Sequence, residues 1–153
     1  MLDEGAAEPR LAVTIALKDW CVVAAITNEG ELVLVEQHRH GVDALTLEPA
    51  GGIIDDGEPP AAAALRELLE ETGYSADSAE LLLTVHPNPA LSDNRAFLFL
   101  ARDARKIADP EERADERTRV VLLDRAKAAD TLRTGGITHA LAVLTLLLAL
   151  ERA

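Results

Sequence analysis

The first third of the chain carries short apolar segments of the kind that form β-strands. Residues 11–17 and 20–27 are rich in valine, isoleucine, leucine and alanine, and residues 31–37 have the same character. The tripeptide 28–30, Asn-Glu-Gly, supplies residues that favour a tight turn between the last two segments. We therefore expect a β-sheet in this region, followed by a short extended piece at 46–48.

Further along, the spacing of apolar residues alternates between that of helices and that of strands. The expected helices are 58–72, 123–132 and 137–150, and the expected strands are 79–85, 95–101 and 119–123. Strands combined with crossing helices predict an α+β chain in which a sheet lies between helical layers. Phe97 and Phe99, two residues apart, should share one face of the sheet and belong to the core.

The composition is that of a folded globular protein. The chain has 153 residues, of which 48% are hydrophobic, and this is enough for one domain with its own core. The acidic first ten residues lack the basic and then apolar pattern of a secretory signal. We interpret 1–10 as a flexible N-terminal tail and 11–153 as a single domain. The apolar run 140–150 is shorter than the roughly 20 residues that span a bilayer, so we expect a buried or subunit-facing helix there.

Charge and cysteine content narrow the choice of partners and compartment. The formal net charge of -12 argues against unassisted binding to duplex nucleic acid or to an anionic membrane. The single cysteine, Cys21, lies in an apolar run, so we expect a buried thiol, no disulfide and a cytoplasmic location. The four histidines lack the spacing of a zinc site. Trp20 could stack on a nucleobase, although a lone tryptophan in a strand more often packs into a core.

Residues 52–74 concentrate the side chains that could carry chemistry. On a helix, positions i, i+3 and i+4 share a face, which brings Glu67, Glu70 and Glu71 together. Carboxylates this close repel one another unless a cation lies among them, and hard oxygen ligands of this kind suit Mg²⁺. The opposite, packing side of the same helix should carry the three leucines Leu65, Leu68 and Leu69.

The alternative is an ordinary solvated acidic face on an amphipathic helix, and the flanking residues argue against it. Gly51-Gly52 and Gly57 permit tight turns and a close approach of the backbone to a ligand. Gly73 suits the left-handed residue that ends a helix, and Pro59 suits the first turn. Arg66 is expected to orient a catalytic carboxylate through charge-assisted hydrogen bonds. A plain surface ion pair is the alternative for Arg66.

The spacing of Gly52, Glu58, the run Arg66-Glu67-Leu68-Leu69-Glu70-Glu71-Thr72-Gly73 and the large residue Tyr74 resembles the Nudix box, the defining motif of the Nudix hydrolases. Tyr74 stands where that family usually has an aliphatic residue. The flanking segments 36–41, 48–51 and 87–95 are similar to the branch that acts on ADP-ribose and nucleoside-diphosphate sugars. The resemblance implies a Nudix α/β/α sandwich with a mixed sheet. It also implies Mg²⁺-dependent hydrolysis of a pyrophosphate bond, with Mn²⁺ as a possible substitute, giving a nucleoside monophosphate and a sugar phosphate.

The resemblance also assigns roles to residues. The implied metal ligands are Glu67, Glu70, Glu71 and the carbonyl of Gly51 or of Ala50, with Glu58 in support. The implied general base lies on the acidic loop 109–116, where Glu112 and Glu116 are the candidates, and Glu67 is the fallback. The implied substrate contacts are Arg39, Glu48, Asn94 and Arg95. The branch further implies a homodimer, formed through the N-terminal strands or the apolar C-terminal helix.

Two other functions remain open at this point. One is sanitation of oxidised nucleoside triphosphates such as 8-oxo-dGTP, which would release inorganic pyrophosphate. The other is a Nudix-fold module that binds a nucleotide without turnover. Such modules typically lose carboxylates of the box, whereas all four of its glutamates are present here. The preferred base and sugar do not follow from the sequence.

Overall fold

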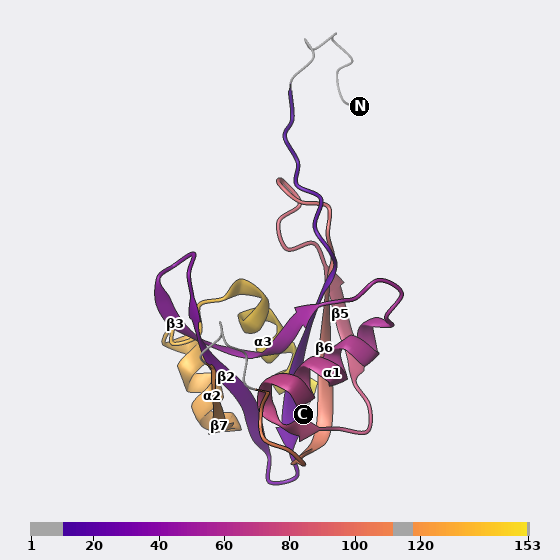
Figure 1. Cartoon of the computed structure of the whole chain (residues 1–153). Helices are drawn as coiled ribbons and strands as arrows, with labels where there is room; N and C mark the ends of the chain where they lie inside the picture. The colour runs from indigo at the N-terminus through magenta and orange to yellow at the C-terminus, as the bar shows by residue number, and fades with distance from the viewer. Residues whose placement is uncertain (1–10, 112–117, 153) are drawn as a thin grey trace.

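The computed structural model describes residues 11–111 and 118–152, so the predicted tail at 1–10 and both Glu112 and Glu116 lie outside the described residues. The strands are β1 (Trp20–Thr27), β2 (Glu31–Arg39), β3 (Ala44–Ile53), β4 (Tyr74–Ser75), β5 (Glu80–Val85), β6 (Ala96–Lys106) and β7 (Thr118–Asp124). The helices are α1 (Pro60–Thr72), α2 (Arg125–Arg133) and α3 (Ala140–Arg152). Figure 1 shows their arrangement.

The strands form one mixed sheet. Its order is β4-β6-β1-β3-β2-β7, with β5 paired to β6. The pairing of β1 with β6 is parallel, and the other strand pairs are antiparallel. β1 changes partner along its length, because residues 20–23 pair with β3 while residues 25–26 pair with β2. The candidate site lies at the part of β1 that pairs with β3, beside Gly51 and Gly52.

Apolar residues on the two faces of the sheet pack against different helices. Cys21, Val23 and Ala25 of β1 belong to a core cluster that contains Leu68 of α1. The intervening Ala24 and Ile26 belong to a second cluster that contains Leu146 of α3. Because successive strand residues point to opposite faces, the sheet lies between α1 and α3, as Figure 1 shows. The predicted α+β sandwich with a mixed sheet is confirmed.

Several predicted boundaries were wrong. Residues 11–17 form no strand, and a single bridge between Ile15 and Ser92 is their only recorded sheet contact in the described chain. The extended piece predicted at 46–48 is the middle of the longer strand β3. The helix predicted to begin at residue 58 begins at Pro60, with Pro59 as its N-cap. Leu69, predicted to pack, is 37% exposed, whereas Leu68 is fully buried, as expected.

The predicted end of the helix that carries the glutamates was confirmed. α1 ends at Gly73, which has φ of 73° and donates its N–H to the Leu69 carbonyl. A Cβ on Gly73 would also clash with the backbone of Ala108, so both conformation and space require glycine there. Phe99 is buried, and Phe97 packs against the same cluster on the α1 side, as predicted. None of the helices in the described chain is long and apolar enough to cross a membrane.

Candidate functional site

Arg66 on α1 is the centre of a network of carboxylates. Its Nε and Nη2 donate to the two oxygens of Glu58, each at 2.9 Å. Its Nη1 donates to Glu67 Oε1 at 2.7 Å and to Glu70 Oε2 at 3.3 Å, and its Nη2 also reaches the Ile53 carbonyl at 3.2 Å. This forked arrangement joins the loop before α1 to the acidic face of α1.

The ion pairs shift the pKa values within this network. The hydrogen bonds from Arg66 are the main reason why the pKa of Glu58 is lowered. The hydrogen bond to Glu58 is in turn the largest cause that raises the pKa of Arg66, against the opposing effect of burial. Glu58 therefore stays ionised, and Arg66 stays charged, throughout the physiological pH range.

Two glycines let the acidic face of α1 approach strand β3. A Cβ on Gly52 would lie 2.5 Å from Cδ of Glu67, well inside van der Waals contact. Glu67 is only 5% exposed, and its carboxylate lies beside Gly52 of β3. A Cβ on Gly51 would collide with the Cys21 carbonyl and lie 3.1 Å from Cα of Val22. The Gly51 N–H donates to Glu71 Oε2 at 3.0 Å. Glycine is required at position 51 because a Cβ there would meet backbone atoms of β1, whereas a Cβ at position 52 could be accepted only if the Glu67 carboxylate moved.

A second network surrounds Glu48 of β3. Its Oε1 accepts from Arg39 Nε at 3.0 Å and from the Thr46 hydroxyl at 2.7 Å. Its Oε2 accepts from Arg39 Nη2 at 2.7 Å and lies 2.7 Å from His139 Nδ1. Because an ionised carboxylate only accepts hydrogen bonds, Nδ1 of His139 carries the hydrogen. These four contacts use the acceptor positions of Glu48, which is 2% exposed.

The pKa of Glu48 reflects these contacts. Burial alone would raise the pKa, but hydrogen bonds from His139, Arg39 and Thr46 together hold it well below its usual range. Glu48 is therefore ionised and neutralised in place by Arg39. An ionised carboxylate with filled acceptor positions is suited to holding Arg39 and His139 in place.

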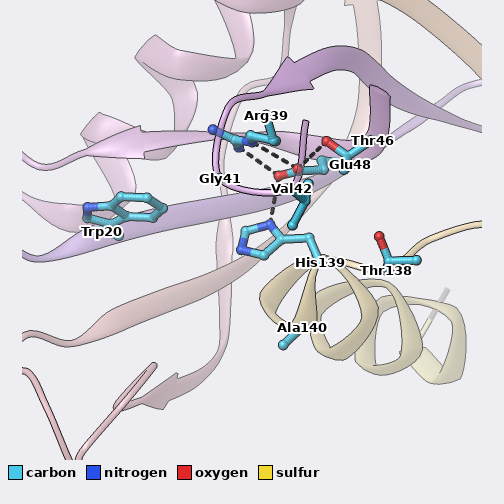
Figure 2. A pocket seen from close by; sticks show the side chains of 9 residues that line it. All are labelled: Trp20, Arg39, Gly41, Val42, Thr46, Glu48, Thr138, His139 and Ala140. Carbon is cyan, nitrogen blue, oxygen red and sulfur yellow. Dashed lines mark hydrogen bonds and ion pairs between the residues drawn. The ribbon is translucent and has the colours of Figure 1, made fainter. Parts of the chain in front are cut away.

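Two cavities adjoin at these networks. One, of about 300 Å³ and called the charged cavity below, lies between β3 and the acidic face of α1. Its lining includes Gly51, Gly52, Arg66, Glu67 and Glu71. The other, of about 400 Å³, lies between the β2–β3 turn and the start of α3. Trp20 and Arg39 line both cavities. Figure 2 shows the second cavity with Trp20, the Arg39–Glu48 pair and His139 around it. A charged cavity and a less polar one therefore share a border.

Comparisons with known proteins give the family of this chain, and they agree with the arrangement of Gly51 and Gly52 of β3 beside the glutamates of α1. The family model described as NUDIX domain matches residues 18–140, which is most of the chain. The chain belongs to the NUDIX domain family. The box at 52–74 thus lies on a Nudix fold, and the resemblance seen in the sequence is confirmed.

Proteins with several different names are similar to this Nudix chain. The methanol dehydrogenase activator of Bacillus methanolicus is 39% identical over 84 residues, which are 55% of this chain and 45% of that protein. The ADP-ribose pyrophosphatase of Mycobacterium tuberculosis is 30% identical over 123 residues, which are 79% of this chain and 59% of that protein. A solved structure of an ADP compounds hydrolase matches with a TM-score of 0.78 and 25% identity, covering 88% of this chain and 71% of the other. The chain spans about half the length of these two curated relatives.

Nudix hydrolases generally use a divalent metal, and the oxygen donors on α1 and β3 are of the type that Mg²⁺ and similar cations prefer. The absence of a Cβ at Gly52 leaves room for the Glu67 carboxylate beside the strand. Within residues 11–111 and 118–152, however, no three His, Cys, Asp or Glu side chains are grouped to hold a metal. Instead, the Arg66 guanidinium joins Glu67 and Glu70. The donors fit in type, but the predicted cluster is not assembled in this arrangement.

Asn94 and Arg95, predicted to touch substrate, have structural contacts in this Nudix fold. Asn94 is 5% exposed, and its Nδ2 donates to the Lys18 carbonyl at 3.2 Å. Arg95 makes a forked ion pair with Asp19, at 3.1 and 2.7 Å. Burial acts to raise the pKa of Asp19, but the hydrogen bonds and the charge of Arg95 lower it by more, so the pKa is below its usual value. Neither residue lines the two cavities described above, so both brace the start of β1 against the segment before β6.

The sequence did not single out His139 as part of this site. It lies 91 residues from Glu48 in the chain, and no local spacing connects the two. The predicted acidic loop begins near the C-terminal half of α1, because the Glu111 N–H donates to the Glu70 carbonyl at 2.8 Å. Cys21 is fully buried, as expected, and burial raises the pKa of its thiol to about 11.

Proposed function

We propose that this protein hydrolyses the pyrophosphate bond of a nucleoside-diphosphate sugar, with ADP-ribose as the first candidate, to give a nucleoside monophosphate and a sugar phosphate. The observation that carries the proposal is the pair of adjoining cavities that share Arg39. A diphosphate needs a cationic and metal-binding region, while the organic group attached to it needs a less charged one. The names of the ADP-ribose pyrophosphatase and of the ADP compounds hydrolase agree with this substrate class.

The metal of the reaction is proposed to be Mg²⁺, with Mn²⁺ as a substitute. Glu67, Glu70, Glu71 and the Gly51 carbonyl would hold it. Gly51 is favoured over Ala50 because Gly51 lines the charged cavity, whereas Ala50 is fully buried. When bound, the metal would neutralise phosphate oxygens and lower the pKa of an attacking water. Its binding would compete with Arg66 for Glu67 and Glu70.

The remaining roles belong to the side chains of this chain. Arg66 orients Glu67 and is itself held by Glu58, which gives the carboxylates a fixed geometry. Arg39 faces both cavities and is the residue placed to bind the diphosphate. Glu48 and His139 hold Arg39 in position, so Glu48 is proposed to act through Arg39 rather than by touching the substrate. For the general base, Glu112 and Glu116 stay the candidates, with Glu67 as the fallback.

The assembly is proposed to be a homodimer in the cytoplasm. Support for the homodimer comes from residues 11–17, where large apolar side chains recur at every second position and are exposed: Leu11 94%, Val13 73%, Ile15 45% and Leu17 52%. A run of this kind is a ready surface for a second copy. Light scattering at micromolar concentration tests it, and a monomer there would contradict it.

The function is tested by a turnover panel of ADP-ribose, GDP-mannose, other nucleotide sugars and 8-oxo-dGTP, each with Mg²⁺, with Mn²⁺ and with chelator, and with the products identified. Release of AMP and ribose 5-phosphate from ADP-ribose is expected. Release of inorganic pyrophosphate from the triphosphate alone would favour sanitation instead. No hydrolysis of any substrate would refute the enzyme assignment.

The variant Glu71→Gln tests the metal assignment. Gln keeps an oxygen that can accept from the Gly51 N–H, so the fold should be retained while a charged ligand is lost. Turnover should fall by about 10²- to 10³-fold, since removal of one group that acts on transition-state charge has effects of this order. The matched control is Glu29→Gln, an exposed carboxylate in the β1–β2 turn. If Glu71→Gln kept its turnover, Glu71 would not be a metal ligand.

A further inference from the structure

We propose that the cavity of about 400 Å³ between Trp20 and the start of α3 is the nucleobase subsite, and that the Trp20 indole is its stacking surface. This inference rests on the proposed function and deepens it, because it states which half of the substrate lies on which side of Arg39.

Trp20 is suited to this role by its place at the border of the two cavities. It is partly buried and packs against the cluster that contains Val22, Leu98 and Leu141. It also lines both the charged cavity and the less polar one. A ring that is anchored by packing and still borders two cavities offers a rigid stacking surface at low entropic cost. A nucleoside lying on it would keep its phosphates within reach of the charged cavity.

The other walls of this cavity favour a planar group of low charge. Val42 and Ala140 contribute apolar surface, and the ring of His139 forms part of another wall of the cavity (Figure 2). Among the described residues that line it, the one carboxylate is Glu48, whose acceptor positions are used by Arg39, Thr46 and His139. The charge of Glu48 is therefore compensated within the protein, and the part of the lining that the structure describes presents no uncompensated carboxylate to a ligand.

The sugar phosphate half of the substrate fits this cavity less well. A sugar has several hydroxyl groups, and a site that recognises them must offer hydrogen-bond partners to each. Glu48 and the Thr46 hydroxyl already bond to each other. Stacking on an indole requires only the face of an aromatic base. Thr138 and Nε2 of His139 then remain for the polar edge of that base.

The test uses the fact that Trp20 is the only tryptophan in the chain. The fluorescence of the full-length wild-type protein is titrated with AMP, GMP and ribose 5-phosphate without metal. Saturable quenching by a nucleoside monophosphate and no change with ribose 5-phosphate are expected. Saturable quenching by ribose 5-phosphate alone, or no saturable response to either nucleotide, would overturn the proposal.

Variants separate stacking from general damage to the fold. Trp20→Leu should weaken AMP binding, measured by calorimetry, by about tenfold or more, because loss of one stacked base commonly has an effect of this size. Trp20→Phe keeps a ring and should stay within about threefold of wild type. The control Phe97→Leu removes an aromatic ring that packs on the α1 side and should leave AMP affinity unchanged. Unchanged AMP affinity in folded Trp20→Leu would overturn the proposal.

The two proposals fail in different ways. If nucleotide sugars are hydrolysed normally and Trp20→Leu does not raise KM, the base lies elsewhere while the function stands. If AMP quenches Trp20 fluorescence but no pyrophosphate bond is cleaved, the subsite stands and the proposed reaction fails. If both hold, Trp20→Leu should raise KM with little change in kcat, as expected for an interaction that binds substrate and transition state equally.

Discussion

Replacement of Gly52 by alanine is the sharpest test of how β3 and α1 cooperate. A Cβ at this position would lie 2.5 Å from Cδ of Glu67, whereas ordinary contacts of this type begin near 3.4 Å. The Glu67 carboxylate must therefore move by about 1 Å. A displacement of about 1 Å at a reacting centre can cost about 100-fold in rate, so kcat on the preferred substrate should fall by about that factor.

Stability should change much less than turnover. Glu67 can rotate away at the expense of its contact with Arg66, and an alanine in a strand restricts the unfolded chain more than glycine does. The free energy of unfolding of Gly52→Ala, from urea denaturation, should therefore stay within about 1 kcal/mol of wild type.

The matched control is Gly30→Ala in the β1–β2 turn. No atom lies within 4 Å of a Cβ there, but φ is 85°, so the variant should lose about 1 to 2 kcal/mol of stability from strain and keep its turnover. The two variants thus separate loss of activity from loss of stability. If folded Gly52→Ala kept more than about a third of wild-type turnover, the position of Glu67 against β3 would not matter for the reaction, and the reasoning would be refuted.

Two further predictions concern buried ionisable groups. Glu48→Gln should lower the free energy of unfolding by about 2 kcal/mol at neutral pH, less than for a fully buried pair because Arg39 is 38% exposed. Since the pKa of Glu48 is lowered on folding from 4.5, its contribution is complete above that value and is lost as pH falls through the folded pKa. The difference between wild type and variant in urea denaturation should therefore shrink below about pH 4, and a constant difference would contradict this. Cys21, with its pKa raised to about 11, should react with iodoacetamide only after denaturation, and rapid labelling of the native protein would show that the thiol is accessible.

The box on α1 could be predicted from sequence because its information is local. Glu67, Glu70 and Glu71 lie within two turns of one helix, and Gly73 ends that helix through its own backbone conformation. The spacing of these residues fixes their shared face without reference to the rest of the chain. The strand predicted at 20–27 from its apolar run was confirmed with the same bounds, whereas the division of its residues between the clusters on the α1 and α3 sides was seen only in the structure.

Residues 11–17 show where local pattern fails. Their composition favours a strand as strongly as that of β1, but a strand requires a partner to satisfy its backbone groups. β1 has β6 on one side and β2 or β3 on the other, whereas residues 11–17 have one bridge at Ile15. The length of β3 was underestimated for the same reason. This strand continues through Gly51 and Gly52 because β1 pairs with both.

By itself, the sequence determined the family, the two-sided sheet and the helix that carries the glutamates of the box, because each depends on residues close together in the chain. The tertiary structure alone decided that Arg66 also reaches Glu58 and the Ile53 carbonyl, that Glu48 is buried against His139, and that Trp20 and Arg39 line both cavities. These arrangements join residues up to 91 positions apart. They depend on which strands pair and which side chains lose water together, and no local periodicity encodes either.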